Sequence, residues 1–303
     1  MKQPIEIPFE KLQACGNDFI VTRPKQRTPG WGIARAAPGP RLDSATALRR
    51  LAIAICDRHR GVGADGFLAL LPPRDRKDAG RVRFFNADGS EAEMSGNGIR
   101  CVARFLASGG RLVRPMRFET PAGVREVTPI PAGDGEISFR VAMGSPVFEP
   151  DRIPFRDTRA VPPVTDYPLT VGGREYRVTV TSMGNPHCSL FVSSFDFDWR
   201  EAGRALESSP AFPNRTNVEF VRVLSKAEIA VRFWERGVGE TASSGTGSCG
   251  AAVAAILNGF TNRRVRVRTS AGVLKVEWSE AGEVFLTAQA SRVASGVFRY
   301  SAS

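Results

Sequence analysis

The chain has 303 residues, of which 42% are hydrophobic and 24% are charged, as in ordinary folded globular proteins. Its net charge of +11 is spread along the chain rather than gathered in one block, so we expect a solvated basic surface and no nucleic-acid partner. No run of about 18 apolar residues occurs and the N-terminus lacks the apolar core of a signal peptide, so we expect no membrane partner and a cytoplasmic location.

Cysteine and histidine are sparse, which limits metal and disulfide chemistry. The five cysteines are odd in number, widely spaced and without a Cys-x-x-Cys pair, so neither a disulfide framework nor a zinc site is indicated. Only two histidines occur, His59 and His187, which excludes a histidine-rich metal cluster. We therefore expect neither a metal nor a cofactor.

In chain order, the first half is predicted to alternate short strands with two helices. Ser44 is the predicted cap of a helix that runs to Gly61-Val62-Gly63, and a second helix follows Gly96-Asn97-Gly98 and stops at 109–110. The proline-rich segment 24–40 is expected to be an exposed loop. The expected strands are 4–9, 18–23, 67–71, 82–85, 115–120, 123–128 and 136–142.

The pattern begins again near Met143-Gly144, where the sequence predicts a domain boundary. A helix is expected at 198–208, and a second at 251–257 is apolar all round, which predicts that it is buried. The expected strands are 167–171, 175–181, 216–223, 229–233, 264–269, 273–278, 283–288 and 296–300. We expect two domains, 1–144 completed by a C-terminal strand at about 290–303, and 145–289.

A Ser-Gly-x-Gly motif opens an apolar helical run in each half, as Ser95-Gly96-Asn97-Gly98 and as Ser244-Gly245-Thr246-Gly247. Serine is a common N-cap, so each serine alone is explained by capping. A cap does not require Gly-x-Gly after it, however, and glycines at a helix N-terminus leave N–H groups open to an anion that the helix dipole favours. The repeat therefore indicates one anion-binding site that is built twice, with two helix N-termini holding one substrate.

A dinucleotide fingerprint is the competing interpretation of the second motif. Gly245, Gly247 and Gly250 have the spacing, and the basic run 263–268 offers charge for a phosphate. The glycines do not follow a strand directly, however, because 235–243 intervenes, and the first motif lacks the third glycine. The nucleotide interpretation is the weaker one.

Polar residues gather before the two motifs and in turns next to apolar strands. Asparagine both donates and accepts hydrogen bonds and arginine pairs with carboxylates, so this set suits a zwitterionic amino-acid ligand. Its members are Asn17, Asn86, Glu91, Asn185, His187, Asn217, Glu235, Arg236 and Glu240.

Seven segments in order make the chain resemble diaminopimelate epimerase, of the cofactor-independent racemase and epimerase superfamily. They are 16–19, 56–65, 85–91, 96–101, 183–188, 215–217 and 235–241. The resemblance implies a mixed α+β fold of two pseudo-symmetric domains, each an antiparallel sheet or barrel around a central helix, with the site in the interdomain cleft. It also implies a homodimer, and PLP-independent epimerisation of LL-2,6-diaminopimelate to the meso form for lysine and cell-wall precursor synthesis.

The resemblance also implies roles for individual residues. Asn86, Asn185, Asn217 and Arg236 are implied to hold the distal end of the substrate, with Glu235 binding the amine and orienting the site. The backbone N–H groups of Gly96, Asn97, Gly245 and Thr246 are implied to hold the reacting carboxylate. Asn17 and His187 are implied to line the site.

The family carries cysteine before each Gly-x-Gly, one thiolate removing the α-proton and the opposite thiol returning one, whereas this chain has Ser95 and Ser244. A hydroxyl is far harder to ionise than a thiol, so serine catalysis requires a partner such as His187 or Glu235. Three hypotheses stay open. The first is a diaminopimelate epimerase with a serine pair, natural or substituted for cysteine. The second is a racemase or isomerase of another small carboxylate, and the third is a binding homologue without turnover.

Overall fold

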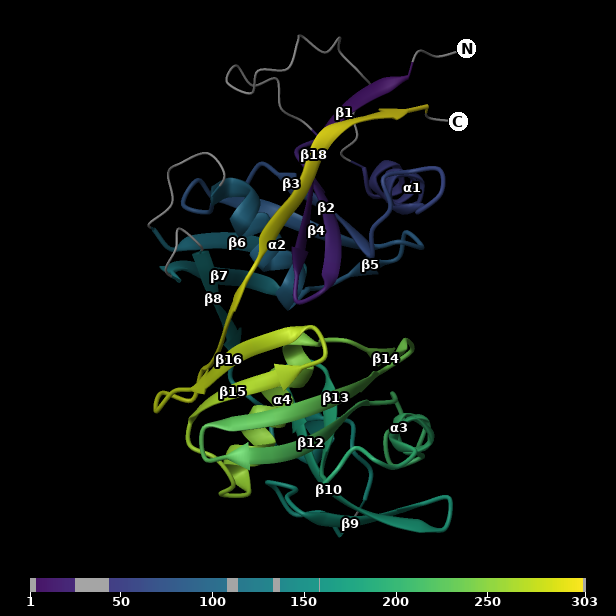
Figure 1. Cartoon of the computed structure of the whole chain (residues 1–303), viewed down its shortest axis with the longest axis vertical. Coiled ribbons are helices and arrows are strands. Elements are labelled where there is room, and N and C mark those ends of the chain that lie inside the picture. The colour runs from purple at the N-terminus through teal and green to yellow at the C-terminus, as the bar shows by residue number, and fades with distance from the viewer. Residues whose placement is uncertain (1–3, 25–43, 108–113, 133–136, 158, 302–303) are drawn as a thin grey trace. The chain divides into compact units, whose positions relative to one another are not determined.

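The computed structural model describes residues 4–24, 44–107, 114–132, 137–157 and 159–301 (Figure 1). The chain forms two compact units, Met1–Phe139 with Gln289–Ser303 and Arg140–Ala288. No helix among the described residues is long and apolar enough to cross a membrane.

Among the described residues, unit 1 contains two helices, eight whole strands and short parts of two more. The helices are α1 (Ala45–Cys56) and α2 (Gly96–Ala107). The strands are β1 (Ile5–Ala14), β2 (Asn17–Thr22), β3 (Gly66–Leu71), β4 (Gly80–Asn86), β5 (Glu91–Ala92), β6 (Met116–Thr120), β7 (Gly123–Pro131), the start of β8 (Ile137–Gly144), the last residue of β17 (Val284–Gln289) and β18 (Ser291–Tyr300).

Unit 2 contains two α-helices and one short 3₁₀ helix. The helices are η1 (Pro150–Arg152), α3 (Trp199–Glu207) and α4 (Gly245–Leu257). In addition to most of β8 and β17, the strands are β9 (Tyr167–Val171), β10 (Arg174–Ser182), β11 (Pro186–Phe191), β12 (Asn217–Ser225), β13 (Glu228–Glu235), β14 (Gly239–Thr241), β15 (Arg264–Thr269) and β16 (Gly272–Trp278).

The two units repeat one order of strand pairing. In unit 1, β1 pairs with β2, β2 with β3, β3 with β4, and β4 with both β5 and β6. In unit 2, β10 pairs with β11, β11 with β12, β12 with β13, and β13 with both β14 and β15. The predicted duplication is therefore confirmed at the level of topology.

The sheets are mixed, whereas the sequence led us to expect antiparallel ones. The pairs β2–β3, β4–β6, β11–β12 and β13–β15 are parallel. Each parallel pair is joined by a connection that carries one of the four α-helices, and a parallel pair needs such a crossover. The helices expected from the apolar periodicity are thus the elements that make the sheets mixed.

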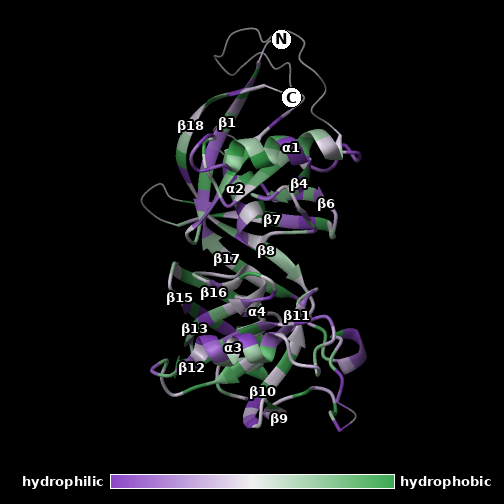
Figure 2. Ribbon diagram, turned by 90° about the vertical axis from the view of Figure 1, so that its right-hand side faces the viewer, coloured by the Kyte–Doolittle hydropathy of each residue, from purple (hydrophilic) through white to green (hydrophobic). Residues whose placement is uncertain are grey.

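One helix in each unit is central to its strands. Helix α2 contacts β1, β2, β3, β4, β7 and β18, and α4 contacts β10, β11, β12, β13, β15 and β16. Residues 247–255 of α4 are all buried, as the all-round apolar sequence predicts. Helices α1 and α3 instead present one buried face each, and α1 carries both hydrophobic and hydrophilic colours in Figure 2.

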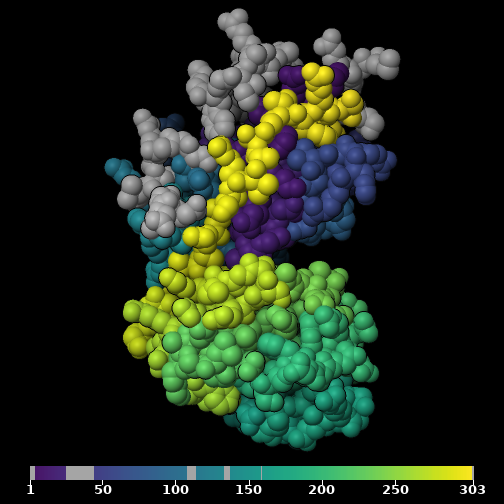
Figure 3. Space-filling view, in the orientation of Figure 1, coloured from purple at the N-terminus to yellow at the C-terminus, as the bar shows by residue number. Residues whose placement is uncertain are grey.

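Several predicted element boundaries are wrong, among them the start of α4, which is Gly245 rather than 251, and the end of β1, which is Ala14 rather than 9. Helix α1 starts after its cap Ser44 as predicted but ends at Cys56, because the N–H groups of Val62 and Gly63 turn back to the carbonyl of Ile55. Strand β18 is longer than the predicted 296–300, since its mostly exposed residues lack alternation while it pairs with nearly all of β1 (Figure 3). The predictions for 25–40 and for the helix stop at 109–110 lie outside the described residues.

Candidate active site

Ser244 caps the N-terminus of α4, and its side chain is 5% exposed. Its Oγ accepts a hydrogen bond from the N–H of Gly247 at 3.2 Å. A Cβ on Gly247 would lie 3.0 Å from both Cβ and Oγ of Ser244, so the second glycine of the motif lets the cap approach the helix. The first-turn N–H groups of Gly245 and Thr246 have no acceptor within the helix, which leaves them directed at an anion.

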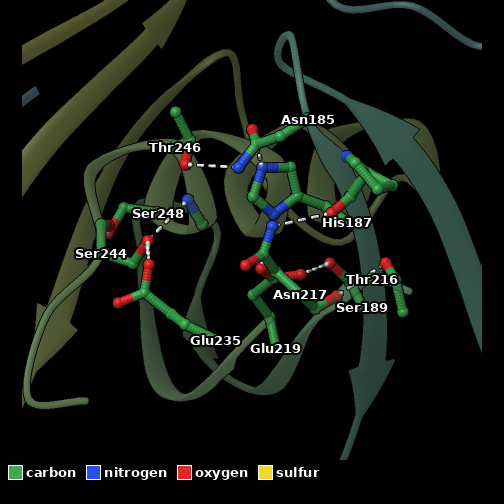
Figure 4. Close-up of polar contacts among 12 residues, drawn as sticks. Asn185, His187, Ser189, Thr216, Asn217, Glu219, Glu235, Ser244, Thr246 and Ser248 are labelled. Carbon is green, nitrogen blue, oxygen red and sulfur yellow. Dashed lines mark hydrogen bonds and ion pairs between the residues drawn. The ribbon is translucent and has the colours of Figure 1, made fainter. Parts of the chain in front are cut away.

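A carboxylate partners this serine directly. The Oγ of Ser244 donates to Oε2 of Glu235 at 2.9 Å, from the last residue of β13 (Figure 4). The hydroxyl therefore donates one hydrogen bond to a carboxylate and accepts one from a helix N–H. That arrangement lets a proton that reaches Oγ be passed on to Glu235.

Ser95 has the same relation to α2, at the N-terminus of the central helix of unit 1. Its Oγ accepts from the N–H of Gly98 at 3.0 Å, and its carbonyl accepts from Ile99 at 2.8 Å. A Cβ on Gly98 would lie 3.1 Å from Cβ of Ser95. Within the residues described, no carboxylate hydrogen bonds to this hydroxyl, which distinguishes it from Ser244.

Asn86 ends β4 as Glu235 ends β13, and both strands lead to a Ser-Gly-x-Gly helix. Asn86 is exposed, and its Nδ2 donates to Oγ of Ser90 at 2.9 Å. Its amide holds the turn that leads into α2 and offers no basic group.

Asn17 is the first residue of β2, directly after the turn at Cys15 and Gly16, and is held by unit 1 itself. Its Nδ2 donates to Oδ2 of Asp65 at 2.7 Å, while Arg58 bridges Asp65 and Asp18 at 2.7 and 3.1 Å. Burial alone raises the pKa of Asp18, but hydrogen bonds from Lys11, from the Asp65 N–H and from Arg58 outweigh it, so the net shift is downward. The turn is a braced, partly exposed element.

Arg100 ties the same turn to the N-terminus of α2. Its Nη2 donates to Oδ1 of Asn97 at 2.6 Å and to Sγ of Cys15 at 3.6 Å, and the arginine is fully buried. The Oδ1 of Asn97 is thus occupied by Arg100, and the groups of Asn97 that can donate to an anion are its backbone N–H and Nδ2. Cys15 is partly exposed beside this contact.

Both ring nitrogens of His187 hydrogen bond to residues other than the serines. Its Nδ1 is 2.7 Å from Oε1 of Glu219 and its Nε2 is 2.9 Å from Oδ1 of Asn185 (Figure 4). The ring is fully buried. Of the two partners that the sequence offered for a serine, the structure puts Glu235 in contact with Ser244 and gives both ring nitrogens of His187 to other residues.

Asn217 holds two loops of unit 2 together. Its Nδ2 donates to the carbonyl of Pro186 at 2.9 Å, and its Oδ1 accepts from the N–H of Arg236 at 3.0 Å. Arg236 is exposed, with Nη1 donating to the carbonyl of Asn214 at 3.3 Å. The side chain of Asn217 thus fixes the backbone of Arg236 in place.

The turn that carries Arg236 has a second anchor that the sequence did not reveal. Glu207, at the end of α3, accepts from the indole N–H of Trp234 and from the N–H of Gly237, both at 2.8 Å. These bonds hold the residues on both sides of Glu235 and Arg236. The carboxylate therefore supports the site without being part of it.

The remaining cysteines are in the cores. Burial raises the pKa of Cys56 and of Cys101 to about 12, and it raises the pKa of Cys188 well above its ordinary value. Cys249 is fully buried. Among the described residues, no group of three or more His, Cys, Asp or Glu side chains is arranged to hold a metal.

Glu219 is the residue of this site that sequence reasoning missed. It faces His187 because β11 and β12 are parallel, with Ser189 opposite Glu219. A signal was present, since Glu219 is a charged residue among Val218, Phe220 and Val221 in an apolar strand. Its partner required the strand register, which the sequence alone does not give.

Comparisons with known proteins agree with one another. Residues 40–149 and 179–293 match the family model described as diaminopimelate epimerase. A diaminopimelate epimerase from Pelotomaculum thermopropionicum is 48% identical over 300 residues, covering 96% of this chain and 99% of the relative. One from Desulforudis audaxviator is 45% identical over 291 residues, covering 95% and 98%.

Solved structures share the fold at low identity. A hydroxyproline epimerase from Agrobacterium vitis has a TM-score of 0.64 at 15% identity, covering 97% of this chain and 92% of that one. A methylitaconate-delta-isomerase has a TM-score of 0.63 at 14% identity, covering 98% and 96%. These two likenesses establish the fold alone, and the predicted mixed α+β class is confirmed.

Proposed function

The chain belongs to the diaminopimelate epimerase family, and we propose that it converts LL-2,6-diaminopimelate to the meso form with the groups at the N-termini of α2 and α4. It is an isomerase of the racemase and epimerase type. The observation that carries the proposal is the hydrogen bond from Ser244 to Glu235 at the N-terminus of α4.

Binding of the reacting carboxylate is assigned to backbone N–H groups. Gly96 and Asn97 in α2, and Gly245 and Thr246 in α4, lie in the first turns, where N–H groups lack helical acceptors and the dipole favours an anion. A carboxylate held there accepts charge as the α-proton leaves. We assign the distal carboxylate and amine to Asn86, Asn217 and Arg236, with Asn17 beside them. Asn185, which hydrogen bonds to Thr246, is placed with the N–H groups of the first turn of α4.

Proton removal is assigned to Ser244 with Glu235. As Oγ of Ser244 takes the proton from Cα, its own proton passes to Oε2 of Glu235 over the 2.9 Å hydrogen bond. The electron pair of the broken C–H bond stays on Cα and delocalises into the carboxylate. Glu235 then returns its proton to solvent through Ser244.

Proton return is assigned to Ser95. Its hydroxyl gives a proton to the opposite face of Cα, and the alkoxide, stabilised by the N–H of Gly98, recovers a proton from solvent. One proton leaves the substrate and one enters, so the net reaction is an isomerisation. Because no carboxylate of the described residues hydrogen bonds to Ser95 to supply its proton, this half limits the rate.

The test is loss of the Cα proton signal of LL-diaminopimelate in D₂O, followed by NMR. We expect exchange with the chain itself, and exchange at least about 100-fold faster with the double variant Ser95→Cys/Ser244→Cys, because thiols ionise near neutral pH. Exchange only in the double variant would mean that the chain binds without turnover. Absence of both exchange and binding in both proteins would contradict the substrate.

We also propose that the protein acts in the cytoplasm and as a homodimer. None of the five cysteines forms a disulfide, which suits a reducing compartment. The homodimer follows from the family resemblance. Sedimentation equilibrium at micromolar concentration checks the second point, with a mass of twice 32.8 kDa expected.

A further inference from the structure

Three buried or half-buried side chains form a continuous row behind the N-terminus of α4: Asn185, His187 and Glu219, here called the buried row (Figure 4). His187 is 0% exposed and Glu219 is 1% exposed. The row ends at the helix, because Nδ2 of Asn185 donates to Oγ1 of Thr246 at 3.4 Å. A carboxylate deep in unit 2 is therefore linked to the first turn of α4.

The direction of each bond in the row follows from which atoms carry protons. Oδ1 of Asn185 only accepts, so Nε2 of His187 must carry a proton to hydrogen bond with it at 2.9 Å. At the other nitrogen, one proton lies between Nδ1 and Oε1 of Glu219, which are 2.7 Å apart. Whichever of the two atoms holds that proton, the pair of side chains is neutral overall.

The reversed arrangement, with the amide of Asn185 turned over, is disfavoured by charge. Its Nδ2 would then face Nε2, which would have to be unprotonated, and the remaining Nδ1 proton would leave Glu219 as a buried anion beside a neutral ring. Burial raises the pKa of Glu219, which opposes that anion. The other titratable groups near Glu219 are Glu235 on β13 and Cys188 on β11, and the charge of Glu235 also opposes ionisation of Glu219.

Packing holds the imidazole ring in this orientation. A Cβ on Gly250 of α4 would lie 2.9 Å from Cγ of His187, so the helix backbone closes directly onto the ring. Behind it, Oγ of Ser189 donates to Oε2 of Glu219 at 3.3 Å and occupies the second carboxylate oxygen. Packing and charge therefore favour a single assignment of donors and acceptors along the buried row.

We propose that Glu219 is a positioning residue that acts through His187 to fix Asn185 with its Nδ2 hydrogens toward the first turn of α4. One hydrogen goes to Thr246, and the other joins the helix N–H groups in binding a carboxylate. The site then presents donors only, which selects an anionic acceptor and rejects a group that donates. This inference rests on the proposed function in taking that anion to be a carboxylate of diaminopimelate.

The first test measures protonation of the ring directly and does not depend on turnover. With only two histidines in the chain, a ¹H–¹⁵N spectrum of the imidazoles at neutral pH resolves both, and the exposed His59 is assigned with His59→Gln. We expect a proton on Nε2 of His187. An unprotonated Nε2 would overturn the proposal.

The second test measures binding of LL-diaminopimelate by calorimetry. Glu219→Met keeps the length of the side chain but removes the acceptor, and we expect Kd to rise about tenfold as Asn185 loses its fixed orientation. In Glu219→Gln, Ser189 donates to the amide oxygen and the amide N–H donates to Nδ1, so Nε2 keeps its proton and Kd rises less than about threefold. Glu10→Gln, at a carboxylate of equal burial in unit 1, is the matched control.

Kinetics separate positioning from loss of structure. In the Ser95→Cys/Ser244→Cys background, Glu219→Met is expected to raise KM about tenfold and to change kcat less than threefold, with rescue by Glu219→Gln. Equal KM values in the Met and Gln variants would contradict the proposal. If the chain does not bind diaminopimelate at all, the proposed function fails while the NMR result still decides the orientation of Asn185.

Discussion

The N-termini of α2 and α4 share a scaffold but differ in the groups around their serines. Each serine accepts from the N–H three residues on, at 3.0 Å for Ser95 and 3.2 Å for Ser244, and each needs a glycine there. The strand before the motif ends in Asn86 in unit 1 and in Glu235 in unit 2. Of these two capping serines, only Ser244 donates to a carboxylate among the residues described.

The turns between the first paired strands differ in the same way. In unit 1, the amide of Asn17 donates to Asp65 on an exposed ionic network, whereas in unit 2 Asn185 is held by His187 and Glu219 from the buried side. The repeated order of strand pairing therefore sets the position of a side chain in each unit. The residues around that position decide whether a proton acceptor is present.

The largest expected effect is at the carboxylate that only unit 2 has. Glu235→Gln, made in the Ser95→Cys background so that the other half is not limiting, should slow Cα exchange about 100-fold because Ser244 loses its proton acceptor. Exchange of diaminopimelate in D₂O measures it. Glu240→Gln is the control, since Glu240 pairs with Arg200 at 2.6 Å instead. An equal effect of the two substitutions would contradict a special role for Glu235.

Where the halves are alike, matched substitutions should have matched effects. Gly98→Ala and Gly247→Ala each place a Cβ 3.0 to 3.1 Å from the capping serine and about as close to a phenylalanine ring. Overpacking of this kind costs about 1–3 kcal/mol of unfolding free energy. Urea unfolding measures both, and a loss in one variant alone would show that the two N-termini are not packed alike.

The smallest effect concerns a thiol that only the turn of unit 1 has. Cys15 is partly exposed, whereas Met183 occupies the corresponding place before the Gly-Asn turn of unit 2. At pH 8 a pKa of about 12 leaves Cys56 and Cys101 almost wholly as thiols, and burial protects the other two. We expect one fast-reacting thiol with a chromogenic disulfide, lost in Cys15→Ala; two or more fast thiols would contradict the burial.

Periodicity in the sequence predicted most elements because one face of each is buried. Helix α1 has Leu48, Leu51 and Ile55 at helical spacing, and all three are fully buried. The mostly exposed β18 gave no such signal beyond its end. Strand β11 was not among the predicted strands, because Asn185 and His187 were placed in a polar turn, although only the residues before Pro186 turn. Hydrophobic periodicity indicates which face of an element is buried, and the sequences of β18 and β11 lack that periodicity.

The residues of the candidate site came from motifs, but their contacts did not. The sequence named both His187 and Glu235 as partners for a serine, and it could not choose because the choice depends on which strand ends face α4. The role of Glu219 depends on the parallel register of β11 and β12, which joins residues 32 positions apart. Spacing along the chain contains no information about that register.

The central claim is that the two serines are unequal because only Ser244 has a carboxylate to take its proton. The most direct measurement compares epimerisation rates of the single variants Ser95→Cys and Ser244→Cys on LL-diaminopimelate under identical conditions. The account predicts a rate about tenfold higher for Ser95→Cys, since that substitution repairs the half without a proton partner. Equal rates, or a faster Ser244→Cys, would contradict it.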